Sequence, residues 1–369
     1  MSKILVICPK YPPLLDGLAG HTFHFIQELA KHNDMTLLTD SALVVDKSEH
    51  VKIISSVNKW NFLQVRKAFL ELQTEYDQII IQYVPSLYAS RGGINFSIVF
   101  FFIYLRFIII KNKKTKINVI FHELFYPLQF HWKAIVLHLC HKTMLLFTVL
   151  SAHRGFCSTS YFTDLLKKIP FTKNKIIHLP VGPTIEIPKE LKTGHVNKIL
   201  KLVIFGGYHP SKRYDIIFDT LERLFNEKYK FELTIIGTTI EKLTNDIELP
   251  KNFSQWAKAI GKQDDNNVVS IFEESDFLIS YFSDGMSTRR SSAISALALG
   301  LPIISTKTKR TDNILLSNSD LILFDIDNFE TSLYTFIKSS PKAPLQSSLY
   351  ENHLNWTQIV RKFTHNLLV

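Results

Sequence analysis

The chain has 369 residues, a length that predicts two domains with separate hydrophobic cores. Hydrophobic residues make up 46% of the sequence and aromatic residues 12%, a composition that excludes an intrinsically disordered chain. The 43 basic residues exceed the 33 acidic ones, and the net charge of +10 predicts an anionic partner: a membrane surface, a nucleic acid or a phosphorylated substrate.

The first predicted element is a strand from Ile4 to Cys8, and its apolar run is too short for the core of a signal peptide. The three cysteines are far apart and show neither metal-binding nor disulfide spacing. We therefore expect a cytoplasmic protein in a reducing compartment, with no metal site.

A loop with Gly17 and Gly20 follows this strand, and a helix is expected from about Thr22 to Lys31. Glycines allow the backbone to approach a phosphate or a sugar closely, and His21 would stand at the start of the helix. An ordinary glycine-bearing surface loop gives the same pattern.

Strands and helices then alternate. Strands are predicted at Met35 to Thr39 and Val51 to Ile54, a helix at Trp60 to Glu75, and a buried strand at Ile79 to Ile81 that stops before Pro85. The continuous apolar run of the last strand is typical of a parallel sheet that is covered on both faces.

The most hydrophobic segment runs from Ile94 to Ile110. It is shorter than the ~20 apolar residues that cross a bilayer, and it contains Arg106, so we expect a buried helix packed on the sheet. Alternatively, its exposed edge contacts an anionic bilayer together with a basic cluster, aided by the mixed segment from Trp132 to Arg154. The cluster comprises Lys111, Lys113, Lys114 and Lys116.

Another predicted strand ends at His122 and Glu123. A histidine and a carboxylate at the end of a strand are suited to hold sugar hydroxyls or a developing charge, although a histidine there can also serve only as a packing or capping group. A strand and a helix follow over Phe156 to Lys168. The polar, basic segment from Lys189 to Lys201 is expected to link two domains.

The alternation restarts after this linker. A strand is predicted from Leu202 to Phe205, a tight turn at Gly206 and Gly207, and a helix from Ile216 to Phe225 that Lys212 precedes. A further strand from Phe231 to Ile236 and a short helix from Val268 to Ser275 extend the pattern.

The segment from Ser283 to Thr306 lies between two apolar runs and reads as strand, turn, helix and strand. The helix is expected from about Arg289 to Leu299, capped by Ser287 or Thr288 and ended by Gly300. Ligands of such units bind beyond the carboxyl ends of the strands, where the N-terminal amides of helices attract anions.

Two adjacent arginines occupy the expected first turn of this helix. Cations oppose the helix dipole there, so a phosphate that Arg289 and Arg290 both bind would explain their position. Two solvated arginines on a surface helix are the alternative.

The order and spacing of these segments resemble a GT-B glycosyltransferase of family 4, the retaining type that uses nucleotide-sugars. The resemblance covers nearly the whole chain and rests on the N-terminal glycine-bearing loop, LPVGPTIEIP, FGGYHPSKRYD, DGMSTRRSSAISALALGLPIIST and NWTQIVRKFTHNLL. It implies an α/β protein with two Rossmann-like, doubly wound domains that face each other across a cleft. Residues 1–190 with a returning helix at 356–369 would form the acceptor-side domain, and residues 197–355 the nucleotide-sugar-binding domain.

The resemblance also implies roles for individual residues. Gly20 matches the loop that approaches the donor diphosphate, His122 the histidine near the transferred sugar, and Lys212 the lysine that binds the diphosphate. The expected catalytic residues are His122, Lys212 and Arg290, and the acceptor-side residues are His21, His122 and Glu123. The expected donor-binding residues are Gly20, Gly206, Gly207, Lys212, Asp284, Gly285, Met286, Ser287, Arg289 and Arg290.

Two departures from the family pattern bear on the donor site. The family's arginine after the first glycine of the second domain is Gly207 here, and its two glutamates fall at Ser287 and Ser295. The pattern DG-x-S-x-RR resembles a branch of the family, in which Asp284 would make polar contacts to the donor and one of the two arginines that follow would replace the lost arginine.

The expected reaction moves a sugar from a nucleotide-sugar to a glycan or a lipid-linked oligosaccharide in bacterial surface polysaccharide synthesis. The resemblance implies a metal-independent reaction, so no cofactor or metal is expected, and cations of the protein would stabilise the departing diphosphate. The basic, apolar first domain suggests a peripheral position at the inner membrane.

Other function classes fit the sequence less well. The missing glutamates favour a catalytically silent GT-B subunit that binds a glycan, a lipid or an active partner. An epimerase on the same fold would need acid and base groups in both domains. Nucleic acid is not an expected partner, because the basic residues are not interleaved with exposed aromatic residues.

Overall fold

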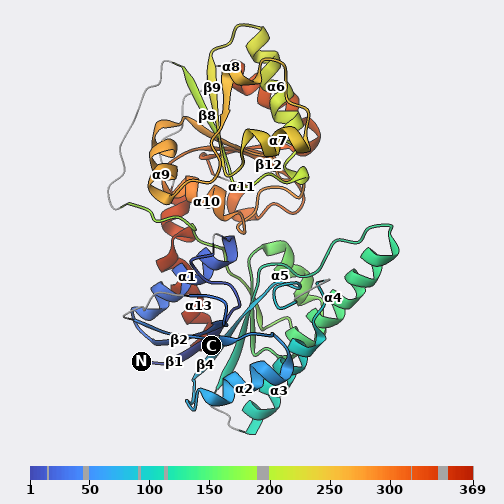
Figure 1. Ribbon diagram of the computed structural model, residues 1–369, viewed down its shortest axis with the longest axis vertical. Helices are drawn as coiled ribbons and strands as arrows, with labels where there is room; N and C mark the ends of the chain where they lie inside the picture. Colours follow the sequence, from blue (N-terminus) through green and yellow to red (C-terminus); the bar gives the residue numbers. More distant parts are fainter. Residues whose placement is uncertain are drawn as a thin grey trace. The chain divides into compact units, whose positions relative to one another are not determined.

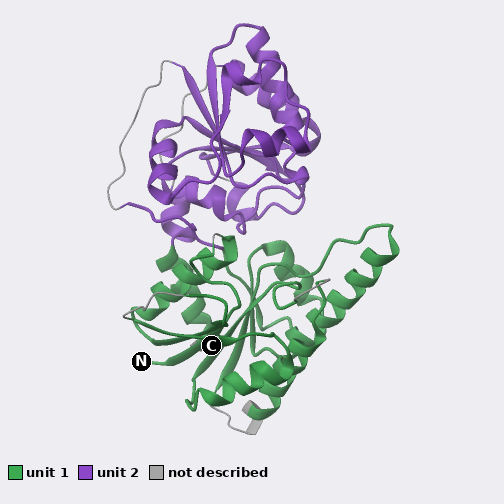
Figure 2. Ribbon diagram, viewed as in Figure 1, with its two compact units in different colours: residues 1–180, 356–369 green, residues 181–355 purple. Residues whose placement is uncertain are grey.

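The computed structural model describes the chain except for residues 15, 45–49, 90–92, 112–114, 189–198, 317, 340–347 and 369. The described residues form two compact units (Figure 2). Unit 1 contains residues 1–180 and 356–369, and unit 2 contains residues 181–355. Each unit has its own parallel sheet.

Unit 1 is built on a 7-stranded sheet in the order β3-β2-β1-β4-β5-β6-β7 (Figure 1). Neighbouring strands are all parallel, so their carboxyl ends lie along one edge. The chain order reverses between β1 and β4, which is where ligands bind in open sheets of this kind. The strands are β1 (Lys3–Ile7), β2 (Asp34–Asp40), β3 (Val51–Val57), β4 (Gln78–Tyr83), β5 (Lys116–Phe121), β6 (Arg154–Cys157) and β7 (Ile176–His178).

Helices cover both faces of this sheet and form a separate apolar cluster on each. The C-terminal helix belongs to the second of these clusters, where the Phe363 ring lies 5.1 Å from that of Phe25 and 4.5 Å from that of Phe156. The helices are α1 (Gly17–Ala30), α2 (Phe62–Glu71), α3 (Phe96–Lys111), α4 (Trp132–Ser151), α5 (Ser160–Lys167) and α13 (Trp356–Leu368).

The apolar segment after residue 94 forms helix α3, and most of its described side chains lie in the core, as expected. Of the basic cluster behind it, Lys113, Lys114 and the side chain of Lys111 lie outside the described residues, whereas Lys116 begins β5. One helix in the described part of the chain, α4, is long and apolar enough to cross a membrane, and 44% of its apolar window is buried within the protein.

Unit 2 is built on a 6-stranded parallel sheet in the order β10-β9-β8-β11-β12-β13. The strands are β8 (Leu200–Phe205), β9 (Phe231–Ile236), β10 (Ala257–Ala259), β11 (Phe277–Ser280), β12 (Ile303–Lys307) and β13 (Leu321–Asp325). The helices are α6 (Tyr214–Asn226), α7 (Ile240–Asp246), α8 (Phe253–Trp256), α9 (Asp265–Glu274), α10 (Ser291–Ala298), α11 (Asn313–Leu316) and α12 (Phe329–Lys338), with short helical turns at Pro210–Lys212, Ile326–Asn328 and Tyr350–Leu354.

The predicted α/β architecture of two Rossmann-like domains is confirmed. Residues 181–187, which the sequence analysis placed in the first domain, pack with unit 2: the Val181 amide donates to Thr288 O at 2.9 Å, and Ile185 lies in an apolar core of that unit.

Helix α1 begins earlier than predicted. Asp16 is its N-cap, and the carboxylate accepts hydrogen bonds from the amides of Leu18 and Ala19. Gly20 and His21 therefore lie inside the helix and not in the preceding loop, which corrects the expected start at Thr22.

Helix α10 begins later than predicted. Its first residue is Ser291, and Arg290 occupies the N-cap position without a side-chain cap. Asp312 Oδ2 instead accepts from both the amide and the hydroxyl of Thr288, at 2.7 and 2.9 Å. Thr288 is thereby held in the loop, so the expectation that Ser287 or Thr288 caps the helix is wrong.

Candidate active site

Two glycines leave the backbone bare at the carboxyl edge of the sheet in unit 2. Gly206 follows β8 with φ +101°, and Gly237 follows β9 with φ +103°. A Cβ at Gly237 would lie 2.8 Å from the Gly206 carbonyl carbon, and one at Gly206 would lie 3.1 Å from Lys212 Nζ. Both positions therefore require glycine. At Gly207 the nearest atom to an added Cβ is Gly237 O at 3.9 Å, so a side chain fits there.

Lys212 lies over this bare backbone at the end of the helical turn Pro210–Lys212. It is half-buried and has no acidic partner among the residues that the structure describes. Burial lowers the pKa of Lys212 to about 8, with a smaller contribution from the positive charge of Arg290. An ammonium group that lies beside a second cation is well placed to receive an anion.

The loop after β11 supplies the second and third cations. Arg289 Nη2 donates to Asp284 Oδ2 at 2.7 Å, and Arg290 Nη2 donates to the other carboxylate oxygen, Oδ1. The Arg290 guanidinium also lies 4.3 Å from the centre of the Phe282 ring. Burial raises the pKa of Asp284, but Arg290 and Arg289 outweigh it and leave the pKa below its ordinary value. The ionised carboxylate therefore fixes the orientation of both guanidinium groups.

This loop is tied to the segment after β12. Thr308 Oγ1 donates to Asp284 O at 2.7 Å, and the Met286 amide donates to Thr306 O at 2.8 Å. Gly285 has φ +84°, and an added Cβ would lie 2.6 Å from Thr311 Oγ1. The side chain of Met286 is fully buried in an apolar core, so only its backbone is available to a ligand.

The two serines at the positions where the resemblance would place glutamates differ in their surroundings. Ser295 is fully buried, and its hydroxyl accepts from the Thr184 amide at 3.2 Å. Ser287 is also buried, but its hydroxyl has no hydrogen-bond partner among the described residues. Ser295 therefore has a structural role, whereas Ser287 retains a polar group that a ligand could use.

In unit 1, His122 directly follows β5 at the carboxyl edge of the sheet. Its Nε2–H donates to Gln82 Oε1 at 2.6 Å, and its ring centre lies 4.6 Å from that of His21 in α1. Burial lowers the pKa of His122 to about 4, with a smaller opposing effect of Asp16. Burial, His122 and His24 lower the pKa of His21 well below its ordinary value. Both imidazoles are therefore neutral at pH 7.

Helix α13 completes this cluster. The Trp356 ring lies 5.2 Å from that of His21 and 5.9 Å from that of His24. Gly20 is half-buried and directly precedes His21 in α1, whereas Glu123 is exposed. The structure thus brings Gly20, His21 and His122 into one neighbourhood of unit 1.

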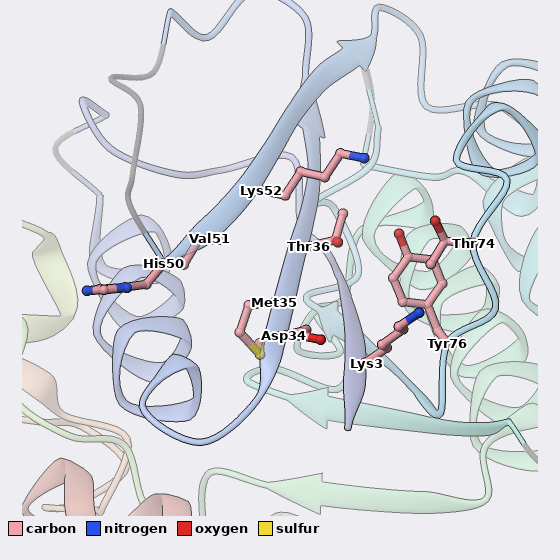
Figure 3. Close-up of a pocket in the computed structure, with 9 residues that line it drawn as sticks. All are labelled: Lys3, Asp34, Met35, Thr36, His50, Val51, Lys52, Thr74 and Tyr76. Carbon is pink, nitrogen blue, oxygen red and sulfur yellow. The ribbon is translucent and has the colours of Figure 1, made fainter. Parts of the chain in front are cut away.

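A pocket of about 440 Å³ lies in another part of unit 1 (Figure 3). Its lining includes Lys3, Asp34 and Val51, which begin β1, β2 and β3. It therefore opens at the amino ends of these strands, on the edge of the sheet opposite to His122, and is not part of the candidate active site.

Several residues of the two sites were not predicted. Gln82 is a polar residue that follows the apolar run Ile79 to Ile81 near the end of β4, which is a usable signal in the sequence. Asp16 directly precedes the first glycine of α1, and an aspartate there is a helix-start signal. Asp312 lies 24 residues from its partner Thr288, and nothing local in the sequence indicates that contact.

No family model matches the sequence, and no curated protein matches it. Solved structures match along the whole chain. Sucrose-phosphate synthase from Thermosynechococcus elongatus has a TM-score of 0.74 at 12% identity, and the match covers 100% of this chain and 98% of the synthase chain. The lipopolysaccharide outer core galactosyltransferase WaaB has a TM-score of 0.66 at 17% identity, and the match covers 99% of both chains. HepE from Anabaena, in complex with UDP and glucose, has a TM-score of 0.67 at 11% identity, and the match covers 100% of both chains.

At these identities the comparisons establish the fold. The chain has the GT-B fold that these glycosyltransferases share, and this confirms the predicted fold class.

Proposed function

We propose that this protein is a retaining glycosyltransferase of family 4, which moves a sugar from a nucleotide-sugar to a glycan or a lipid-linked oligosaccharide. The observation that carries the proposal is the group of cations at the carboxyl edge of unit 2. Lys212 is near enough to Arg290 for the arginine charge to lower its pKa, and it has no acidic partner of its own in the described part of the chain. A diphosphate would offset the repulsion between these cations and accept hydrogen bonds from both.

The chemistry follows from where charge develops. When the bond between the sugar and the diphosphate breaks, the leaving group gains negative charge, and cations fixed in advance stabilise it. Asp284 holds Arg289 and Arg290 in place, and the bare backbone at Gly206 gives the diphosphate room. Losing one such contact costs ~3 kcal/mol, roughly a hundredfold in rate.

The retaining mechanism and the absence of a metal requirement are parts of the same proposal. Asp284, the carboxylate of this loop, is bound by two guanidinium groups and is therefore a weak nucleophile. Lys212 and the two arginines supply the positive charge that a metal ion would otherwise supply.

In unit 1, we assign the acceptor side of the reaction to His21, His122 and Glu123. Because His122 Nε2–H is engaged by Gln82, the neutral imidazole has Nδ1 left as a hydrogen-bond acceptor for a sugar hydroxyl. HepE was solved with UDP and glucose, and WaaB is named as a lipopolysaccharide galactosyltransferase. UDP-sugars and bacterial surface glycans are therefore the first donor and acceptor to test, and a lipid-linked acceptor would place the protein at the cytoplasmic face of the inner membrane.

The test is a thermal-shift screen with UDP, GDP, ADP, CMP and their common sugar conjugates. A ligand at one hundred times its Kd adds ~2.7 kcal/mol to the unfolding free energy, which shifts Tm visibly. One nucleotide should stabilise the protein. Arg290→Ala and Lys212→Ala should abolish that shift, whereas Lys251→Ala, which removes an exposed lysine elsewhere in unit 2, should preserve it. If Arg290→Ala left the Kd of the donor unchanged, the donor-binding role of Arg290 would be wrong.

The second candidate is a catalytically silent GT-B subunit that binds a glycan, a lipid or an active partner. The observation in its favour is that Ser287 and Ser295 stand where the family has glutamates. The Ser295 hydroxyl is moreover engaged in a hydrogen bond with the Thr184 amide. Silence across the whole nucleotide panel would favour this function over sugar transfer.

A further inference from the structure

Helix α4 has its apolar residues on the outside. Its exposed apolar positions recur at intervals of three and four, which places them along one face of the helix. These residues are Trp132, Ile135, Val136, Leu139, Leu146, Phe147 and Leu150, and we call them the α4 stripe. Figure 1 shows α4 along the outer side of unit 1, with its first turns projecting past the rest of that unit. A stripe of this kind normally faces a core.

The opposite face of α4 is partly polar and is locked onto the protein. His138 Nδ1–H donates to Tyr126 O at 2.7 Å, while His141 Nδ1 accepts from the Tyr126 amide at 3.1 Å. The remaining ring N–H of His141 donates to Gly93 O at 2.6 Å. These partly buried hydrogen bonds oppose a rotation of the helix that would bury the stripe, because rotation would leave polar groups unsatisfied. The outward orientation of the stripe is therefore part of the fold.

Aromatic side chains extend the exposed surface at the start of α4. Phe130 is fully exposed, and Leu128 is 61% exposed in the loop that leads to Trp132. The neighbouring helix α3 adds Phe100 and Phe107, which are 61% and 65% exposed. Aromatic rings are favoured at the boundary between water and the acyl chains of a bilayer.

The charge of this region is one-sided. Residues 78–163 contain nine lysines and arginines but one acidic residue, Glu123, so most of the net charge of +10 arises in this stretch. Neither α3 nor α4 contains an acidic residue. Lys133 and Lys142 are exposed, and the spacing of α4 places them on opposite sides of the stripe. An apolar stripe between lysines matches a surface with anionic headgroups above acyl chains.

This charge decides between the possible occupants. A second copy of the chain would bring two faces of the same positive charge together, and their repulsion disfavours such a dimer. A membrane-spanning position is disfavoured because the inner face of α4 is committed to hydrogen bonds with the protein. A helix with one face on the protein and an apolar face outward fits a position in the plane of the interface.

We propose that α4 docks unit 1 onto an anionic lipid bilayer. The α4 stripe and Phe130 enter the boundary of the acyl chains, while Lys133 and Lys142 contact lipid phosphates. The sequence pattern suggested α3 and the lysines after it, whereas the structure assigns the main contact to α4. The biological sense of this docking rests on the proposed function, but binding can be measured without activity.

Vesicle flotation tests the electrostatic part. The protein should bind vesicles of phosphatidylcholine with phosphatidylglycerol more tightly than phosphatidylcholine alone, and added salt should weaken the binding. Lys133→Gln with Lys142→Gln should lower the affinity about 30-fold, since each lysine near such a surface contributes about fivefold. Lys251→Gln with Lys258→Gln, which changes two exposed lysines of unit 2, should leave the affinity unchanged.

A second pair of variants tests the apolar part. Phe130→Ser with Leu139→Ser should reduce binding to anionic vesicles, whereas Leu63→Ser with Phe171→Ser should not, although those residues are also exposed. Equal binding by all variants, or no preference for anionic lipid, would overturn the proposal. So would a dimer in sedimentation that the Phe130 and Leu139 changes dissociate. Nucleotide stabilisation should be the same in every variant, so a failure of the donor site would be seen separately.

Discussion

Lys212 is half-buried beside another cation, so its charge responds to pH in the range where the protein works. In the free protein its pKa is about 8, because burial and Arg290 disfavour the charged form. A nucleoside diphosphate would bind the protonated lysine, and its own last ionisation at about pH 6 is complete well below that range. The affinity for the nucleoside diphosphate should therefore be constant between about pH 7 and pH 8, and it should fall above pH 8 by up to about tenfold per pH unit.

Isothermal titration calorimetry with the stabilising nucleotide checks this dependence. Lys212→Arg should flatten the profile, because an arginine keeps its charge throughout this pH range. Lys251→Arg should leave the profile of the parent protein unchanged. A pH dependence that persists in Lys212→Arg would assign the titration to another group.

The glycines at the sheet edge make a second prediction at the scale of single residues. Gly237→Ala should lower the unfolding free energy by more than about 1 kcal/mol, because φ is +103° and the new Cβ would lie 2.8 Å from Gly206. Gly207→Ala should change it by less than about 0.5 kcal/mol, since its nearest atom would be 3.9 Å away. Urea unfolding of the two variants measures the difference, and similar losses in both would contradict this account.

Single residues also show how far the candidate site could be read from the sequence. Adjacent arginines after an Asp-Gly turn predicted an anion site, and in the structure the charge of Arg290 reaches Lys212 and lowers its pKa. The sequence could not show that Asp284 bridges the two arginines, because a side-chain contact depends on the path of the loop. The sequence also could not show that the Ser295 hydroxyl accepts a hydrogen bond from the Thr184 amide, 111 residues away.

At the scale of elements, alternating apolar runs located most strands and helices, because each run has to cover a sheet or belong to one. The ends were less accurate, since they depend on individual caps and on distant partners. Asp16 extends α1 to Gly17, and Asp312 delays the start of α10. Strands β7, β10 and β13 were not predicted, and β7 and β10, with three residues each, are too short for a pattern to emerge.

The cap of α1 can be tested directly. Asp16→Ala should lower the unfolding free energy by ~1 kcal/mol, because the amides of Leu18 and Ala19 lose their acceptor. The ion pair of Asp16 with Lys10 is partly exposed, so Lys10→Ala alone should cost less. Denaturant unfolding of both variants separates the cap from the ion pair, and an equal loss in the two would show that the cap contributes nothing.

At the scale of the whole molecule, the chain leaves unit 1 after residue 180 and returns to it at Trp356. Phe363 is fully buried against Phe25 and Phe156, so the core of the first unit contains a residue from the far end of the chain. The family resemblance predicted a returning helix at 356–369, but the position of this helix beside α1 depends on contacts that no local sequence pattern contains.

The two units have separate cores, so mutations in each core should act on different unfolding transitions. Phe363→Ala should cost about 3–5 kcal/mol and lower the transition of unit 1, because the rings of Phe25 and Phe156 that pack on Phe363 belong to that unit. Phe272→Ala, which removes a ring 5.3 Å from that of Phe205, should lower the transition of unit 2 instead. Differential scanning calorimetry should show two components that move one at a time, and nucleotide should raise the one that Phe272→Ala lowers. If both variants shifted a single transition equally, the units would unfold as one cooperative structure, and the C-terminal helix would stabilise the whole chain.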